Sequence, residues 1–126
     1  MTFVLDASAL LAVLLEEPGK ERVLTVLGSA AIASVNWSEV VARLVNREAS
    51  DAQVAAAAGL MAGRIEAFGM EDADLAGRLI ARTRPLGLSL GGRCCLAFGI
   101  LRKATVLTTD RAWAGLDVGV AIELIR

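Results

Sequence analysis

The chain has 126 residues and a mean hydropathy of +0.59, which is enough apolar material for one domain with its own core. Its 13 basic and 14 acidic residues nearly cancel, which excludes a strongly basic nucleic-acid-binding protein, and it contains no histidine. No apolar run reaches the roughly 18 uncharged residues of a membrane helix, and no basic start is followed by a cleavage site. We therefore expect a single cytoplasmic domain over residues 1–126.

Short apolar runs alternate with segments of helical spacing along the whole chain. The runs with the composition of buried strands are residues 2–5, 30–33, 65–70, 104–108 and 118–125. Helical spacing covers residues 8–15 and 20–27, begins again at 36, 50 and 71, and covers 89–103. Unbroken apolar strands that alternate with helices are typical of a parallel sheet covered on both faces. The sequence therefore predicts a three-layer α/β/α fold with a mainly parallel central sheet.

Three carboxylates occupy equivalent places relative to these strands. Asp6 comes directly after the first strand, and Asp110 comes directly after the fourth. Glu39 lies in the first turn of the helix that follows the second strand. Because the carboxyl ends of parallel strands meet at one edge of a sheet, we expect these acids to converge there. Carboxylates that converge without a cation repel one another, and a hard divalent ion relieves that repulsion.

Each acid also has a purely structural interpretation. Asp6 and Asp110 are of the residue type preferred at helix N-caps, and Glu39 follows Asn36 with the spacing of a capping box. For any one acid alone, capping is the more common role, because acids are frequent in first turns. The occurrence of all three, in a chain with no other candidate site, favours a metal or catalytic site.

Four segments carry a resemblance to a known family. They are FVLDASALL at residues 3–11, VNWSEV at 35–40, LSLGGRCCLA at 88–97 and VLTTDRAW at 106–113. In this order and spacing they resemble the signature blocks of PIN-domain proteins, most of all the VapC-type toxins of bacterial toxin–antitoxin pairs. The resemblance implies a Mg²⁺- or Mn²⁺-dependent endoribonuclease that cleaves RNA, is held inactive by a cognate antitoxin and usually forms a homodimer.

The resemblance also implies roles for individual residues in metal-assisted hydrolysis of RNA phosphodiesters. The catalytic and metal-binding residues would be Asp6, Glu39 and Asp110, and the residues that orient them would be Ser8, Thr108 and Thr109. Arg43 and Arg93 lie near these acids in the sequence pattern, and we regard them as candidate RNA contacts.

Gly92 departs from the family pattern, which has an aspartate at this place that is normally a principal metal ligand. If Ser89 is an N-cap, residue 92 is third in its helix, where an acid is favourable and a glycine costs about 1 kcal/mol relative to alanine. One base separates the codons of Asp and Gly, so we expect either an inactivating change or a naturally degenerate family member. In both cases we predict a normal fold, little nuclease activity and at most one weakly bound ion.

Other functions remain open or are disfavoured. Gly92 is also compatible with a non-catalytic PIN-like module that binds RNA or a protein. A receiver-type domain with Asp6 as phosphate acceptor is disfavoured, because no second acid adjoins Asp6 and no lysine ends a later strand. Cys94 and Cys95 have no histidine to activate them as nucleophiles, and we interpret them as buried small hydrophobic residues.

Apolar residues of the first two helices exceed what one sheet face needs. Either these helices are simply buried, or they form a groove for an amphipathic helix of the antitoxin. The alanine-rich stretch at residues 52–62 is an alternative binding or dimer surface.

Overall fold

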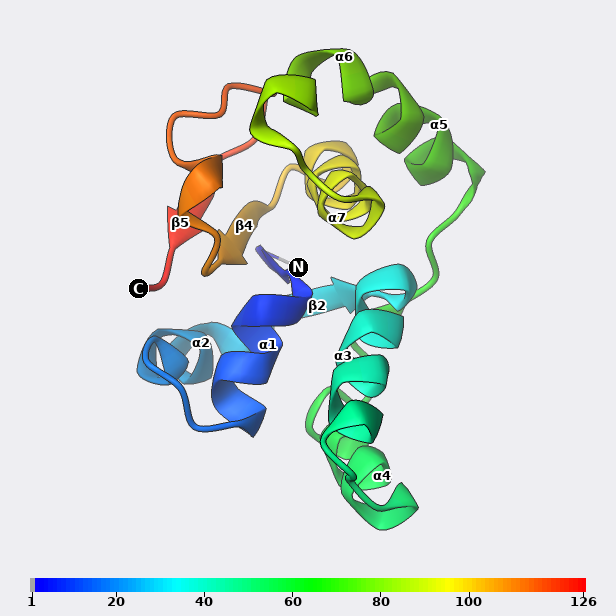
Figure 1. The fold of residues 1–126 in the computed structure, drawn as a ribbon, viewed down its shortest axis with the longest axis vertical. Helices are drawn as coiled ribbons and strands as arrows, with labels where there is room; N and C mark the ends of the chain where they lie inside the picture. Colours follow the sequence, from blue (N-terminus) through cyan, green and yellow to red (C-terminus); the bar gives the residue numbers. More distant parts are fainter. Residues whose placement is uncertain (1) are drawn as a thin grey trace.

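A computed structural model describes residues 2–126 (Figure 1). Its strands are β1 (Phe3–Leu5), β2 (Ala30–Ala33), β3 (Ile65–Glu66), β4 (Thr105–Thr108) and β5 (Ile122–Leu124). Across the described residues these strands form one five-stranded sheet in the order β3-β2-β1-β4-β5, and each neighbouring pair is parallel. The predicted α/β fold with a parallel central sheet is confirmed.

Helices cover both faces of this sheet (Figure 1). They are α1 (Ala7–Leu14), α2 (Lys20–Val26), α3 (Ser34–Asn46), α4 (Asp51–Leu60), α5 (Met70–Arg78), α6 (Ile80–Thr83) and α7 (Leu90–Arg102), with short 3₁₀ turns at Leu27–Ser29, Arg84–Leu86 and Arg111–Trp113. Helices α5 and α7 pack on one face of the sheet, and α1, α2, α3 and α4 pack on the other.

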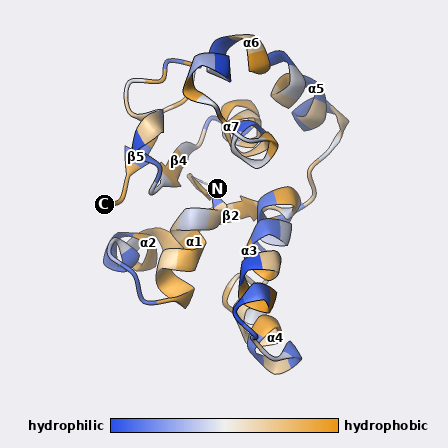
Figure 2. Ribbon diagram, viewed as in Figure 1, coloured by the Kyte–Doolittle hydropathy of each residue, from blue (hydrophilic) through white to orange (hydrophobic). Residues whose placement is uncertain are grey.

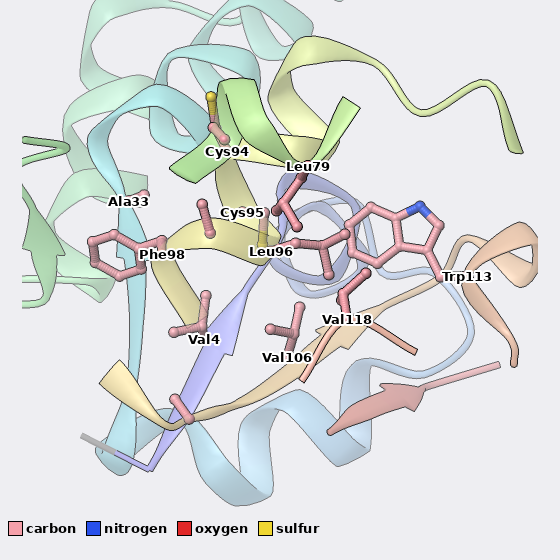
Figure 3. Packing of buried hydrophobic residues seen from close by; sticks show 13 residues of the cluster. Val4, Ala33, Leu79, Cys94, Cys95, Leu96, Phe98, Val106, Trp113 and Val118 are labelled. Carbon is pink, nitrogen blue, oxygen red and sulfur yellow. The ribbon is translucent and has the colours of Figure 1, made fainter. Parts of the chain in front are cut away.

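The alternation of side chains along the central strands divides the core into two layers. Val4 of β1 and Val106 of β4 belong to the layer that contains Leu96 of α7 (Figure 3). The next residues along these strands, Leu5 and Leu107, belong to the layer that packs against α1 and α3. All five side chains are fully buried, so both faces of the sheet are closed to water at its centre.

The edge strands are shorter than the sequence predicted. β3 ends at Glu66 and β5 begins at Ile122, because each has one neighbouring strand and its flanks adopt other structures. Gly69 is the N-cap of α5, and Gly119 has a left-handed φ of +86°, which interrupts an extended run. The helix expected from residue 71 to Pro85 is likewise divided, with α5 ending at Arg78.

Helix α3 begins earlier than predicted. Its first residue is Ser34 and its N-cap is Ala33, which is also the last residue of β2, so the strand leads into the helix without a loop. Asn36 is therefore inside the helix, and the predicted capping box between Asn36 and Glu39 is wrong. Ser89 is confirmed as an N-cap, and Ser50 caps α4 in the same way, because each hydroxyl accepts a hydrogen bond from an amide three residues later.

Hydrophobic residues run along β2, β4 and most of α1 (Figure 2). Leu10 of α1 and Val23 of α2 are fully buried, whereas Leu24 is 49% exposed, so these two helices are used mainly in the core. Among residues 2–126, no helix combines the length and the hydropathy needed to span a bilayer.

Candidate active site

A cavity of about 490 Å³ opens at the carboxyl ends of β1 and β4. Asp6, Glu39 and Asp110 all line it, together with Gly92 and Trp113. The acids reach it because β1 and β4 are adjacent and parallel, and α3 begins directly at the end of β2, on the other side of β1. The structure therefore brings together the three acids that the sequence places after strands.

Asp6 is buried, with 7% of its surface exposed. Its Oδ1 accepts hydrogen bonds from the Ser8 hydroxyl at 2.6 Å and from the Ala9 amide at 2.8 Å, and the second bond caps α1. Its Oδ2 accepts a hydrogen bond from the Thr108 hydroxyl at 2.5 Å. Burial raises the pKa of Asp6 above its ordinary value, although these hydroxyl and amide donors oppose the rise, and the charge of Glu39 adds to it.

The hydroxyls of Ser8 and Thr108 connect Asp6 to the segment that carries Asp110. Each hydroxyl donates to Asp6, so its oxygen is free to accept from the backbone. The Ser8 hydroxyl accepts from the Thr109 amide at 3.0 Å, and the Thr108 hydroxyl accepts from the Asp110 amide at 3.0 Å. Thr109 thus takes part through its backbone. This network fixes Asp6 relative to the loop after β4.

Glu39 and Asp110 are exposed on the cavity wall. Oε1 of Glu39 accepts a hydrogen bond from Nδ2 of Asn36 at 2.7 Å. Oδ1 of Asp110 accepts from the Ala112 amide at 2.9 Å, which caps the 3₁₀ turn at Arg111–Trp113. Asp6 and Asp110 are therefore N-caps as well as cavity residues, whereas Glu39 does not cap α3.

The donor atoms of this cavity are those that a hard divalent cation prefers. Carboxylates line it, and the most buried of them, Asp6, has hydroxyl and amide partners and a second carboxylate nearby. Within residues 2–126, no three acidic or cysteine side chains are grouped closely enough to enclose an ion. The arrangement fits an ion such as Mg²⁺, which is commonly held by one or two carboxylates and by water.

The sequence matches the PIN domain family over residues 3–119. The chain belongs to this family. No curated protein sequence matches it.

Solved structures share the fold of this PIN domain over nearly their whole length. DNA-bound VapBC from Salmonella typhimurium has 18% sequence identity and a TM-score of 0.79, with 100% of this chain and 99% of that chain covered. VapBC2 from Rickettsia felis bound to a promoter DNA fragment has 15% identity and a TM-score of 0.74, with 98% of each chain covered. VapBC-5 from Mycobacterium tuberculosis has 23% identity and a TM-score of 0.66, with 99% of this chain and 98% of that chain covered.

Gly92 of the PIN domain lies in the first turn of α7 and lines the cavity. Its amide donates to the Ser89 hydroxyl at 3.1 Å, as expected for the third residue of a capped helix. A Cβ at this position would lie 3.2 Å from Cζ2 of Trp113, whose ring packs against Leu96 and Val118 (Figure 3). An aspartate at position 92 would add a fourth carboxylate to the cavity, and the Trp113 ring would have to move by a few tenths of an ångström to admit its Cβ.

The two arginines considered as RNA contacts lie in different places. Arg43 lines the cavity, four residues after Glu39 on α3. Arg93 does not line it, because its Nη1 donates to the carbonyl oxygen of Ala76 on α5 at 3.1 Å. The structure therefore brings Arg43, and not Arg93, to the three acids.

Cys94 and Cys95 of the PIN domain are buried free thiols, as the sequence predicted. Burial raises the pKa of both, and the pKa of Cys95 lies well above its ordinary value. A thiol that stays protonated is a poor nucleophile, so neither residue offers an alternative reaction centre.

Two residues of this site escape sequence reasoning. Asn36 lines the cavity and bonds Glu39, but its three-residue offset from Glu39 is as typical of a capping box as of a shared helix face. Gly91 contacts Glu39 from α7, and the sequence holds no signal for this contact apart from the paired glycines at 91 and 92.

Proposed function

We propose that this PIN domain is a toxin of the VapC type. It is built as a Mg²⁺- or Mn²⁺-dependent endoribonuclease, and Gly92 impairs its activity. The observation that carries the proposal is the convergence of Asp6, Glu39 and Asp110 on one cavity, with Asp6 buried and bonded by neutral donors. PIN domains are in general nucleases, and the solved structures with this fold include VapBC toxin–antitoxin complexes. Such a protein acts in the cytoplasm, where its RNA substrate is found.

Asp6 would be the central ligand of the ion, and Glu39 and Asp110 would hold it directly or through water. When bound, the ion supplies Lewis acidity toward a phosphodiester and lowers the pKa of water. The Ser8 and Thr108 hydroxyls orient Asp6, because each donates to a different carboxylate oxygen and thereby restrains its rotation.

Arg43 supplies positive charge at the wall of a cavity that is otherwise acidic. It would contact an RNA phosphate and position the backbone without reading the base sequence. Gly92 leaves the cavity one carboxylate short of the family pattern, so we expect weaker ion binding and little cleavage.

The decisive experiment replaces Gly92 by aspartate and measures Mn²⁺-dependent cleavage of single-stranded RNA, together with growth arrest on expression. We expect Gly92→Asp to increase cleavage about a hundredfold, because it restores a carboxylate at a position that lines the cavity. Gly77→Asp is the matched control, since it adds the same charge to a helix, at a place with open space and outside the cavity.

A folded Gly92→Asp variant without any gain in cleavage would contradict the proposal. If that variant binds RNA without cutting it, the chain is better described as a non-catalytic PIN-like binding module.

An apolar groove offers a surface for the antitoxin. It has a volume of about 490 Å³ and lies between the end of α1, α3 and α4. Its walls include Leu14, Leu15, Leu44, Ala56 and Leu60. We propose that an amphipathic helix of the antitoxin binds here, because the groove unites the apolar first helix with the alanine-rich helix.

Co-purification with the cognate antitoxin tests the groove. Ala56→Glu places a charge on the groove wall and should abolish co-purification, whereas Ala55→Glu on the same helix lies outside the lining and should not. Loss of the antitoxin in both variants, or in neither, would refute this assignment. We further propose that the domain forms a homodimer, which sedimentation velocity would reveal.

A further inference from the structure

We propose that Asn36 is a positioning residue that holds Glu39 against the first turn of α7. This inference rests on the proposed function, because it concerns one of the three acids that would hold the ion. It gives Asn36 a role other than capping, and it adds a residue to the three acids.

The amide of Asn36 joins two helices through one nitrogen. Its Nδ2 donates to Oε1 of Glu39 at 2.7 Å on α3, and to the carbonyl oxygen of Gly91 at 3.0 Å on α7. Both partners are acceptors, so the opposite amide orientation would place three oxygens together and is excluded. Asn36 is 1% exposed, and its bond to Gly91 is buried whereas its bond to the exposed Glu39 is only partly buried.

Gly91 provides independent support for the same position of Glu39. A Cβ built on Gly91 would lie 2.6 Å from the carboxyl carbon of Glu39, closer than real Cβ atoms approach. Glu39 therefore occupies space that any other residue at position 91 would fill. The Asn36 amide holds one side of the Glu39 carboxylate, and the absence of a side chain at Gly91 leaves room on its other side. Together they specify one position for this carboxylate, which an ordinary exposed glutamate would not need.

The amide oxygen of Asn36, Oδ1, differs from the amide nitrogen in its surroundings. It is buried and has no hydrogen-bond partner within residues 2–126, although buried side-chain oxygens are usually paired. Asn36 also lines the cavity that contains the three acids. A buried oxygen without a partner costs stability, so this position carries asparagine for the two bonds that its nitrogen donates and not for the packing of the core.

Mn²⁺ titration of the full chain by calorimetry tests the inference, in the parent chain and in Gly92→Asp. We expect Asn36→Ala to weaken Mn²⁺ binding about tenfold to a hundredfold, as the loss of a residue that orients a ligand does. Ser38→Ala is the matched control, because Ser38 lies on the same helix, is exposed and does not line the cavity.

Two further comparisons separate positioning from a merely structural role. Gly91→Ala should weaken Mn²⁺ binding while the melting temperature in metal-free buffer stays the same or rises, because alanine favours the helix and displaces only the Glu39 side chain. In a Glu39→Ala background, Asn36→Ala should change Mn²⁺ affinity little further, because it acts through Glu39. Independent, additive losses would overturn the inference.

A metal-free measurement keeps the inference distinct from the proposed function. The side-chain amide protons of Asn36 should exchange slowly in ¹⁵N-resolved spectra, and Glu39→Ala should shift and accelerate them. Exchange at the solvent rate in the parent chain would refute the positioning role. Slow exchange without any Mn²⁺ binding to Gly92→Asp would support the role and contradict the proposed metal-dependent activity instead.

Discussion

Two buried aspartates of this domain have opposite surroundings. Asp6 at the sheet edge is 7% exposed, and Asp72 in the α5 and α7 layer is 4% exposed. Asp72 pairs with Arg102, whose Nη1 lies 2.7 Å from Oδ1, and it accepts from the Gly69 amide at 2.9 Å. Asp6 has hydroxyls and one amide as partners, and the nearby charge of Glu39 has the same sign as its own.

The pKa values of these two carboxyl groups move in opposite directions. Burial acts to raise the pKa of both. At Asp72 the bonds from Arg102 and Gly69 outweigh burial and lower the pKa, whereas at Asp6 the neutral donors do not, and it stays raised. The helical layer thus contains a cation bonded to its own acid, whereas within residues 2–126 no cation bonds Asp6, although Arg43 lines the same cavity. The lack of a bonded cationic side chain at Asp6, more than acidity itself, distinguishes the candidate active site.

The largest expected effect concerns catalysis. In the Gly92→Asp background, Asp6→Asn should reduce Mn²⁺-dependent RNA cleavage about a hundredfold, or about 2.7 kcal/mol in the barrier, because it removes the buried metal ligand. Asp72→Asn is the matched control and should leave the rate per folded molecule unchanged. Equal losses in the two variants would show that the difference between these aspartates has no functional meaning.

The next effect concerns stability at the paired aspartate. Asp72→Asn should lower the free energy of unfolding by about 2 kcal/mol at pH 7, because it weakens a charged hydrogen bond and leaves Arg102 with only the Glu66 carboxylate, 3.8 Å from its Nε, as an ionic partner. The folded-state pKa of Asp72 is lowered, so this contribution is present above the ordinary value of 3.8 and is lost as the pH falls below it.

Urea unfolding of the parent chain and Asp72→Asn between pH 7 and pH 3 measures this dependence. The stability difference should shrink as the solution becomes acidic. Asp74→Asn on the same helix alters an exposed pair with Arg78 and should have little effect at any pH. A difference between parent and Asp72→Asn that persists unchanged in acid would show that packing, and not the charge, is responsible.

The sequence predicts those parts of the molecule that depend on local pattern and on general topology. The buried runs at β1, β2 and β4 predict the parallel sheet, and the rule for its carboxyl edge brings Asp6 and Asp110 together. The start of α3 was missed, because the asparagine–glutamate spacing resembles a cap until the strand is seen to enter the helix directly.

The contacts between residues far apart in the chain could not be predicted from the sequence, for a physical reason. Asn36 meets the Gly91 carbonyl 55 residues later, and Asp72 meets Arg102 30 residues later. Such pairs depend on how two helices lie against each other, which side-chain periodicity does not specify. The direction of Arg93, toward α5 instead of the cavity, depends on the same helix packing.

The smallest expected effect concerns the stability contribution of Asp6, the buried aspartate that has no bonded cation within residues 2–126. In metal-free buffer at pH 7, Asp6→Asn should raise the free energy of unfolding by about 1 kcal/mol, since it removes a buried charge while Oδ1 can still accept from the Ala9 amide. The pKa of Asp6 is raised on folding, so in the pH range just above 3.8 the folded parent retains a proton that the unfolded chain has lost. Its stability should therefore fall as the pH rises above 3.8, and that decrease should be absent in the variant.

Added Mn²⁺ should reverse the order, because an ion that binds the folded parent stabilises it and has less to bind in Asp6→Asn. Thermal melts with and without Mn²⁺ measure the stability of the parent chain and of Asp6→Asn under both conditions. Asp51→Asn, at the exposed start of α4, is the control for the loss of a charge in a first helical turn. If Asp6→Asn destabilises the metal-free protein, Asp6 is chiefly a structural cap. The contrast with Asp72 would then describe two ways of stabilising a helix, and it would no longer separate a functional acid from a structural one.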